Sequence, residues 1–224
     1  MGKNLVIAID GPAASGKSTT AKRLAEALNF MYIDTGAMYR ACALKALEDK
    51  VDLSNLDAVE EMLDGIHISF KVIDNESRIF LNGYDISEQI RSSSISQKAS
   101  DIATIANVRH RMVYLQRKMA ECHSVVMDGR DIGSFVFPNA DFKFFMVATL
   151  ETRAKRRQLE MQEKGMEVDF ETLKNELAWR DANDANREIA PLVKTDDAIE
   201  VNTTNMSVDE QVKYIFEKVR EKVA

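Results

Sequence analysis

Short apolar runs alternate with amphipathic stretches along most of the chain. The runs are four to eight residues long, rich in valine, isoleucine and phenylalanine, and several end at glycine, proline, aspartate or threonine, which is typical of buried strands. We predict such strands at residues 4–10, 30–36, 125–128, 142–149 and 197–204. The amphipathic stretches have the spacing of helices. We predict these helices at residues 17–29, 38–50, 55–64, 95–120 with a break near Ala106, 151–164, 170–187 and 208–223.

Strands that alternate with helices predict a parallel sheet covered on both faces, which is an α/β three-layer sandwich with a five-stranded parallel sheet. Ligands of such sheets bind beyond the carboxyl ends of the strands. Four groups should therefore lie at one edge: Asp10-Gly11, Asp34-Thr35, Asp128-Gly129-Arg130-Asp131 and Thr149. Trp179 and the phenylalanines at 142, 144 and 145 are expected in the core.

Residues 66–87 break this pattern. Apolar and polar residues alternate there, and turn signals occur at Asp74-Asn75 and Asn82-Gly83. The segment predicts a hairpin or a three-stranded antiparallel meander, inserted into the α/β chain.

Composition narrows the class of protein. The chain has 224 residues, 45% of them hydrophobic and 29% charged, which fits one soluble domain over residues 1–224. The net charge of −6 disfavours a nucleic-acid partner. Residues Cys42 and Cys122 form no CxxC motif and predict two reduced, partly buried thiols. The short apolar run near the amino terminus fits neither a signal peptide nor a membrane span. We therefore expect a cytoplasmic protein without a membrane partner and, since no heptad seam is visible, a monomer.

The stretch GPAASGKST fits the phosphate-loop pattern G-x-x-x-x-G-K-[ST] at every fixed position. It follows a predicted strand and opens a predicted helix, as the motif requires. Glycines let backbone N–H groups curl around phosphate oxygens, the lysine places a charge on the terminal phosphates, and the serine hydroxyl can reach Mg²⁺. The predicted ATP-binding residues are Gly11, Pro12, Ala13, Ala14, Ser15, Gly16, Lys17, Ser18 and Thr19.

The loop alone does not say what happens to the nucleotide. A GTPase should carry an N-K-x-D motif, and this sequence has none. A phosphotransferase needs cations around the transferred group, so the arginines are informative. Residues Arg180, Asp184 and Arg187 fall on one stripe of a predicted helix, which indicates either an acceptor site or a solvated, salt-bridged face. The basic group Arg153, Arg156 and Arg157 fits either a solvated face or a mobile lid.

Four segments together carry a resemblance: IAIDGPAASGKSTTAKRLAEAL, YIDTGAMYRA, MDGRDIGSFVFPNA and NREIAPLV. They closely resemble the bacterial cytidylate kinases, which are P-loop nucleoside monophosphate kinases, over nearly the whole chain and including the antiparallel insertion. The resemblance implies transfer of the γ-phosphoryl group of ATP to CMP or dCMP, with Mg²⁺. It also implies an acceptor-binding region at about 36–110, containing the insertion 66–87, and a lid at about 151–167.

Residue roles are carried over by position from the same resemblance. It assigns the CMP phosphate to Arg40, Arg130 and Arg187, and cytosine to Ser100, Arg109 and Asp131. It assigns the sugar to Arg180 and Asp184, and it includes the hydroxyl of Thr35 in the acceptor site. It assigns ATP phosphates to Lys17 and to the lid residues Arg153 and Arg157, and the Mg²⁺ shell to Ser18 and Asp128. Asp128 has a second interpretation, which is to hold the turn.

Cytosine recognition by this set is chemically reasonable, because a carboxylate accepts from the N4 amino group while arginine and serine donate to O2 and N3. Without the resemblance, Ser100 would be interpreted as a surface or packing serine and Arg109 as helix surface. Two alternatives stay open: a kinase of another acceptor, such as a different nucleoside monophosphate or shikimate, and a regulatory nucleotide-binding protein. The three histidines lack ligand spacing, so no zinc site is predicted.

Overall fold

The computed structural model describes residues 4–74, 76–163 and 165–223. The chain forms two compact units, one comprising Ile33–Cys122 and the other the segments on either side, up to Tyr32 and from His123 onward. The single domain over residues 1–224, with an acceptor-binding region and a lid inside it, stays a prediction. Among the described residues, no helix is long and apolar enough to cross a membrane.

A five-stranded sheet has the strand order β2-β6-β1-β7-β8. Its strands are β1 (Val6–Asp10), β2 (Met31–Asp34), β6 (Val125–Gly129), β7 (Phe142–Val147) and β8 (Ile199–Asn202). Pairing is parallel from β6 through β1 and β7 to β8, and Asp10 lies opposite Gly129. The predicted α/β fold with a five-stranded sheet is therefore confirmed.

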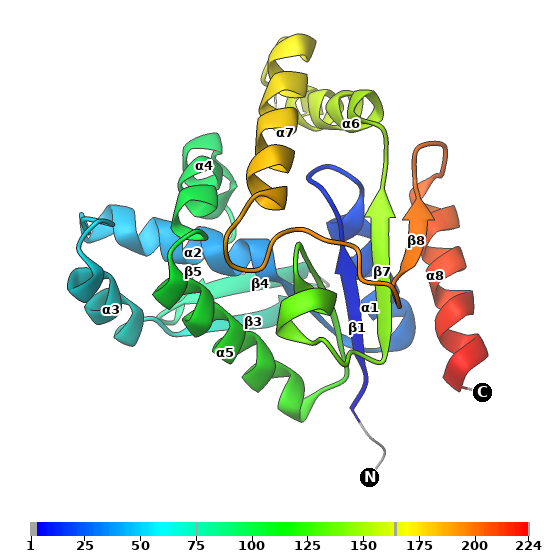
Figure 1. Cartoon of the computed structure of the whole chain (residues 1–224), viewed down its shortest axis with the longest axis horizontal. Coiled ribbons are helices and arrows are strands. Elements are labelled where there is room, and N and C mark those ends of the chain that lie inside the picture. Colours follow the sequence, from blue (N-terminus) through cyan, green and yellow to red (C-terminus); the bar gives the residue numbers. More distant parts are fainter. Residues whose placement is uncertain (1–3, 75, 164, 224) are drawn as a thin grey trace. The chain divides into compact units, whose positions relative to one another are not determined.

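The helical elements of the unit outside Ile33–Cys122 are α1 (Lys17–Leu28), the π-helical turn η2 (Ile132–Val136), α6 (Leu150–Glu163), α7 (Phe170–Ala185) and α8 (Val208–Val223). Its core joins the sheet to α1 and α8. Buried side chains from the strands, α1 and α8 form one cluster, which includes Ile7, Ile9, Leu24, Val126, Phe144 and Ile215. Figure 1 shows α8 beside β8 and α1 behind β1. The core prediction is wrong for Trp179, whose residue surface is 48% exposed on α7.

The unit Ile33–Cys122 is mainly helical and contains the predicted insertion. Its helices are α2 (Thr35–Glu48), α3 (Leu56–Asp64), the 3-10 turn η1 (Gln89–Arg91), α4 (Ser93–Ile102) and α5 (Ala106–Cys122). Strands β3 (Ile68–Ile73), β4 (Glu76–Leu81) and β5 (Tyr84–Asp85) form an antiparallel sheet, which confirms the meander. Residue Asn75, part of the predicted first turn, lies outside the described residues.

The long helix predicted over residues 95–120 is two helices, and the break comes slightly before Ala106. The Arg109 guanidinium donates to the Ala103 carbonyl at 3.1 Å, across the connection. Helix α4 packs against α2, whereas α5 packs against α3. The prediction of two partly buried thiols is wrong for Cys122, which is exposed, while Cys42 is buried.

Candidate active site

The loop of residues 11–19 needs glycine at positions 11 and 16. Gly11 has a φ of 144°, and a Cβ there would lie 2.1 Å from the Met146 carbonyl oxygen. Gly16 has a φ of 95°, and a Cβ there would lie 2.9 Å from Gln211 Oε1. Both positive φ values favour glycine. A side chain would also collide with strand backbone at position 11 and with the buried amide of Gln211 at position 16.

Lys17 begins α1 and lies inside this loop. It is 4% exposed, and its Nζ donates to the Pro12 carbonyl at 2.6 Å and to Ser15 Oγ at 3.4 Å. Burial and the nearby charge of Arg130 lower the pKa of Lys17 to about 7. A polyanion in the loop would favour the charged form, so the ammonium is placed for a phosphate rather than for solvent.

The carbonyl groups of the loop are held from outside. Thr203 Oγ1 donates to the Ser15 carbonyl at 2.9 Å, and Arg153 Nη1 donates to the Ala13 carbonyl at 3.2 Å. Arg156 Nη2 donates to the Thr203 carbonyl at 2.6 Å. In a trans peptide the C=O and the N–H of the next residue point in opposite directions. The bonds to the Ala13 and Ser15 carbonyls therefore also fix the N–H groups of Ala14 and Gly16.

The predicted lid arginines differ in their surroundings. The Arg153 side chain is 6% exposed and makes a two-pronged ion pair with Asp181, at 3.1 and 2.6 Å. Arg157 instead pairs with Glu160 on α6 at 2.9 Å. Arg156, which the sequence showed only as one member of a basic run, is the arginine that supports the loop through Thr203.

Ser18 and Asp128 are adjacent, as a shared cation would require. Ser18 Oγ donates to Asp128 Oδ2 at 2.7 Å, and the Tyr32 hydroxyl donates to Asp128 Oδ1 at 2.9 Å. Mg²⁺ prefers oxygen ligands and keeps several of its waters, so one hydroxyl and one carboxylate suit it. In the described part of the chain, no three or more acidic, histidine or cysteine side chains are grouped so that they could hold a metal ion. One hydroxyl and one carboxylate do not fit a metal that needs three or more such side chains.

A buried carboxylate joins two of the predicted phosphate-binding arginines. Asp184 is 4% exposed, accepts from Arg130 Nε at 2.6 Å, and also accepts from Arg187. Burial would raise the pKa of Asp184, but the charges of Arg130 and Arg187, with a smaller contribution from Arg180, lower it. The alternative of a solvated helix face is therefore wrong for Asp184.

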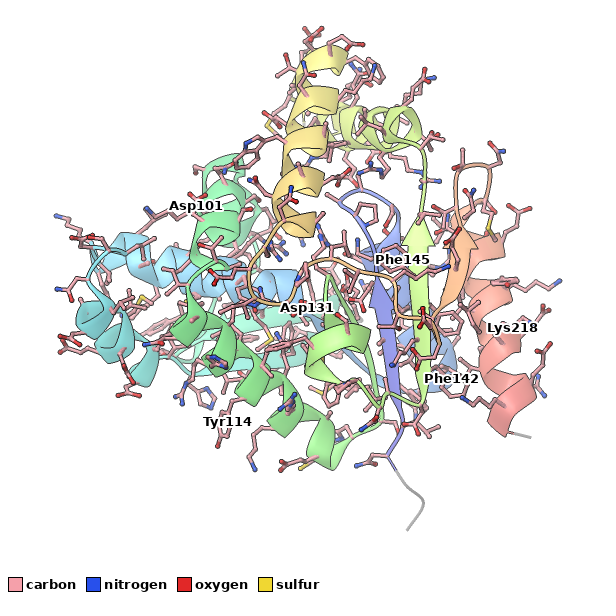
Figure 2. All side chains as sticks on the ribbon, viewed as in Figure 1. Asp101, Tyr114, Asp131, Phe142, Phe145 and Lys218 are labelled. Carbon is pink, nitrogen blue, oxygen red and sulfur yellow. The ribbon has the colours of Figure 1, made fainter. Side chains whose placement is uncertain are left out.

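Asp131 opens the turn η2 and is 5% exposed. In Figure 2 it is labelled at the start of the green turn that follows β6. The backbone N–H groups of the next two residues, Ile132 and Gly133, donate to the carboxylate of Asp10 at 2.8 and 2.7 Å. Burial, together with the charge of Asp131, raises the pKa of Asp10 to about 7 despite these bonds. The sequence placed Asp10 at the ligand-binding edge of the sheet but assigned it no role, since its only signal is its place at a strand end.

The other predicted acceptor residues belong to the unit Ile33–Cys122. Thr35 is buried at the start of α2, and Arg40 donates to Asp34 at 3.0 Å. Ser100 is half-buried on α4. The interpretation of Arg109 as helix surface is wrong, because it is 1% exposed and its guanidinium lies 5.8 Å from the ring centre of Tyr39.

Comparison with known proteins identifies the family. A family model described as cytidylate kinase matches residues 7–221. A cytidylate kinase of Lactobacillus johnsonii is 47% identical over 216 residues, covering 96% of this chain and 94% of that protein. A cytidylate kinase of Bacillus thuringiensis is 48% identical over 216 residues, covering 96% of each. The chain belongs to the cytidylate kinase family.

Solved structures with low identity share the fold of this cytidylate kinase family member. An uncharacterized protein from Eubacterium ventriosum has a TM-score of 0.53 at 18% identity and covers 97% of this chain and 99% of its own. A Thermus thermophilus protein has a TM-score of 0.51 at 15% identity, with full coverage of both chains. The family match spans both compact units and so includes the antiparallel sheet.

Proposed function

We propose that this chain transfers the γ-phosphoryl group of ATP to CMP or dCMP, giving ADP and CDP or dCDP. One observation carries the proposal beyond family membership. Asp128 at the end of β6 holds Ser18 of the loop at 2.7 Å, and two residues later the same turn presents Arg130. The predicted donor loop and the predicted acceptor arginine thus leave the same edge of one sheet.

At the donor end, the residues 11–19 surround the triphosphate and Lys17 supplies the buried positive charge. The loop is already fixed by Thr203 and Arg153, so its N–H groups need little rearrangement when ATP binds. Catalysis of this kind depends on positioning and charge neutralisation.

The acceptor phosphate is held by Arg130 and Arg187, with Arg40 as the third member of the clamp. The planar guanidinium fork pairs two phosphate oxygens at once. Asp184 supplies the counter-charge for Arg130 and Arg187. An incoming phosphate takes over part of that role, which leaves Asp184 for the sugar beside Arg180.

Selectivity for the base is assigned to Asp131, Ser100 and Arg109. The carboxylate accepts from the N4 amino group, and the other two donate to the ring acceptors. Uracil presents a carbonyl oxygen in place of that amino group and would face a carboxylate lone pair. Thr35 contributes a hydroxyl to the same acceptor site.

Transfer needs no covalent enzyme intermediate, because the acceptor is already an anion. A CMP phosphate oxygen forms the new bond to the γ-phosphorus as the bond to the bridging oxygen of ADP breaks, in line. Ser18 and Asp128 would hold Mg²⁺, which would neutralise phosphate charge. We assign Arg153 and Arg157 to the ATP side, with Arg153 acting from its fixed position against the loop.

We further propose that the protein acts in the cytoplasm as a monomer on free nucleotides, without a nucleic-acid or membrane partner. The net charge of −6 supports the absence of a nucleic-acid partner. Sedimentation at micromolar concentration tests the monomer, and a dimer at that concentration would contradict it.

The function is tested with an assay of ADP release over CMP, dCMP, UMP, AMP, GMP and shikimate. We expect CMP and dCMP to be the fast acceptors. The variants Lys17→Ala and Arg130→Ala, checked for folding by circular dichroism, should lose at least about a hundredfold in kcat. Near-normal turnover in either folded variant would count strongly against the assignment.

A narrower test concerns Asp131. Its replacement by alanine should lower the ratio of kcat/KM for CMP to that for UMP, while KM for ATP changes less. An unchanged ratio would show that the base is read elsewhere.

A further inference from the structure

Asp10 caps a turn that belongs to a distant part of the chain. Its Oδ1 accepts from the N–H of Ile132 at 2.8 Å and its Oδ2 from the N–H of Gly133 at 2.7 Å, across 122 and 123 positions of sequence. The side chain is buried, and the residue lies opposite Gly129 in the parallel pairing of β1 with β6. One carboxylate thus fixes the backbone immediately after Asp131.

The turn needs such a cap from outside. Its own hydrogen bonds run from the N–H groups of Phe135 and Val136 to the Asp131 carbonyl, at 2.9 and 3.0 Å, and from Phe137 to the Ile132 carbonyl, at 2.7 Å. The first N–H groups of a helical turn have no partner within it. An aspartate at the N-cap position usually accepts, with its own side chain, from the N–H of the second or third residue of the helix, which here includes Gly133.

Asp131 occupies that first position, yet its side chain makes no capping hydrogen bond. Asp10 does the capping instead, at both N–H groups. The cap of this turn thus comes from Asp10 and not from Asp131. The turn differs in this respect from the starts of α2, α3, α4 and α7. At each of those four helices, the side chain of the residue preceding the helix accepts the capping hydrogen bond.

We propose that Asp10 is a positioning residue for acceptor selectivity. By capping η2, it keeps the Asp131 carboxylate away from the turn and directed at the base. The inference rests on the proposed function, in which Asp131 reads the amino group of cytosine. Asp10 does not touch the acceptor itself.

The test variant is Asp10→Asn, which keeps the size of the side chain. An amide can accept one of the two N–H groups but turns its own NH₂ toward the other, so the cap is half lost. Asp131 is then expected to turn back and complete the cap. The ratio of kcat/KM for CMP to that for UMP should fall roughly tenfold or more, the size expected when a hydrogen bond to a charged group is misplaced.

This ratio separates positioning from general damage. Both acceptors share the donor site, so a disturbed phosphate loop lowers both rates and leaves the ratio unchanged. The matched control is Asp141→Asn, because Asp141 accepts from the N–H of Val6 at 2.9 Å, at the start of the same strand β1. The control should keep the wild-type ratio.

The double variant Asp10→Asn with Asp131→Ala completes the test. If Asp10 acts through Asp131, the double variant has the same CMP-to-UMP ratio as Asp131→Ala alone, a complete failure of additivity. Independent, multiplying effects would overturn the proposal, and so would a folded Asp10→Asn protein with the wild-type ratio. Should Asp10→Asn not fold, Asp10→Glu shifts the carboxylate by one methylene, and the same fall is expected.

Different results would exclude base reading by Asp131 and positioning by Asp10. A wild-type ratio in Asp131→Ala would overturn the base-reading part of the proposed function. A lowered ratio in Asp131→Ala together with an unchanged ratio in Asp10→Asn would overturn only the inference about Asp10.

Discussion

The carboxylate of Asp184 offers a sharp test of how the acceptor arginines are held. It is buried between Arg130, whose side chain is 20% exposed, and Arg187, whose side chain is 10% exposed. Replacement by asparagine keeps the shape but removes the charge. Two guanidinium groups are then left largely desolvated without their common counter-charge.

The size of the effect follows from that burial. Breaking a buried ion pair by removing one partner costs about 3–5 kcal/mol, because the remaining charge is uncompensated. Partial exposure of Arg130 and the nearby charges of Asp128 and Asp181 offset some of this, so we expect about 3 kcal/mol for Asp184→Asn. For a chain of this size that corresponds to a fall in Tm of about 6–12 °C. The affinity of the Asp184→Asn variant for CMP should also fall, roughly tenfold, because Arg130 and Arg187 lose the carboxylate that orients them.

The assay is urea unfolding at neutral pH followed by circular dichroism, with KM for CMP and for ATP measured on the same samples. Asp209→Asn is the matched control, because Asp209 pairs with Arg23 on the surface, where the two side chains are 77% and 48% exposed. An exposed pair contributes at most about 1 kcal/mol. The control should therefore be nearly as stable as the wild type.

The lowered pKa of Asp184 gives the sign of the pH dependence. Its contribution is complete above 3.8, the ordinary value, and is lost as the pH falls through the lowered pKa of the folded state. The difference between wild type and Asp184→Asn should shrink in acid. Equal stability of the two asparagine variants at neutral pH, with an unchanged KM for CMP, would refute this account of the arginine pair.

Three other predictions concern the thiols and the phosphate loop. Ellman's reagent at pH 8 should modify Cys122 within minutes, whereas Cys42 should react only on unfolding because burial raises its pKa to about 12; rapid reaction of both would contradict its burial. Gly11→Ala should lose ATP binding and at least about 2 kcal/mol of stability, since its Cβ would lie 2.1 Å from a β7 carbonyl; wild-type affinity would exclude this loop geometry. Thr203→Val should raise KM for ATP about three- to tenfold through loss of its bond to Ser15, and an unchanged KM would show that the loop is fixed without it.

The fold was accessible from sequence because its strands are short apolar runs that end at turn residues. The meander of β3, β4 and β5 was equally legible from alternation and from the turn signal at Asn82-Gly83. The turn between α4 and α5 was harder to place, because residues 103–105 contain neither glycine nor proline. Tertiary contacts decide it, with Arg109 buried and bonded to the Ala103 carbonyl.

The hydrogen bonds between residues of the site could not be predicted from the sequence in the same way. The loop motif is local, so its residues could be named from spacing alone. The bond from Arg130 to Asp184 joins positions 54 apart, and the cap from Asp10 joins positions more than 120 apart. Residue types at those positions suggested charge and hydrogen bonding, but only the register of β1 with β6 brings Asp10 to the turn.

The central claim is that the γ-phosphoryl group of ATP ends on the phosphate of CMP. Phosphorus NMR of the wild-type protein with ATP, CMP and Mg²⁺ follows every phosphate in one experiment. The account predicts that ADP and CDP appear in equal amounts as ATP and CMP disappear, without inorganic phosphate. Release of inorganic phosphate with CMP unchanged would contradict it.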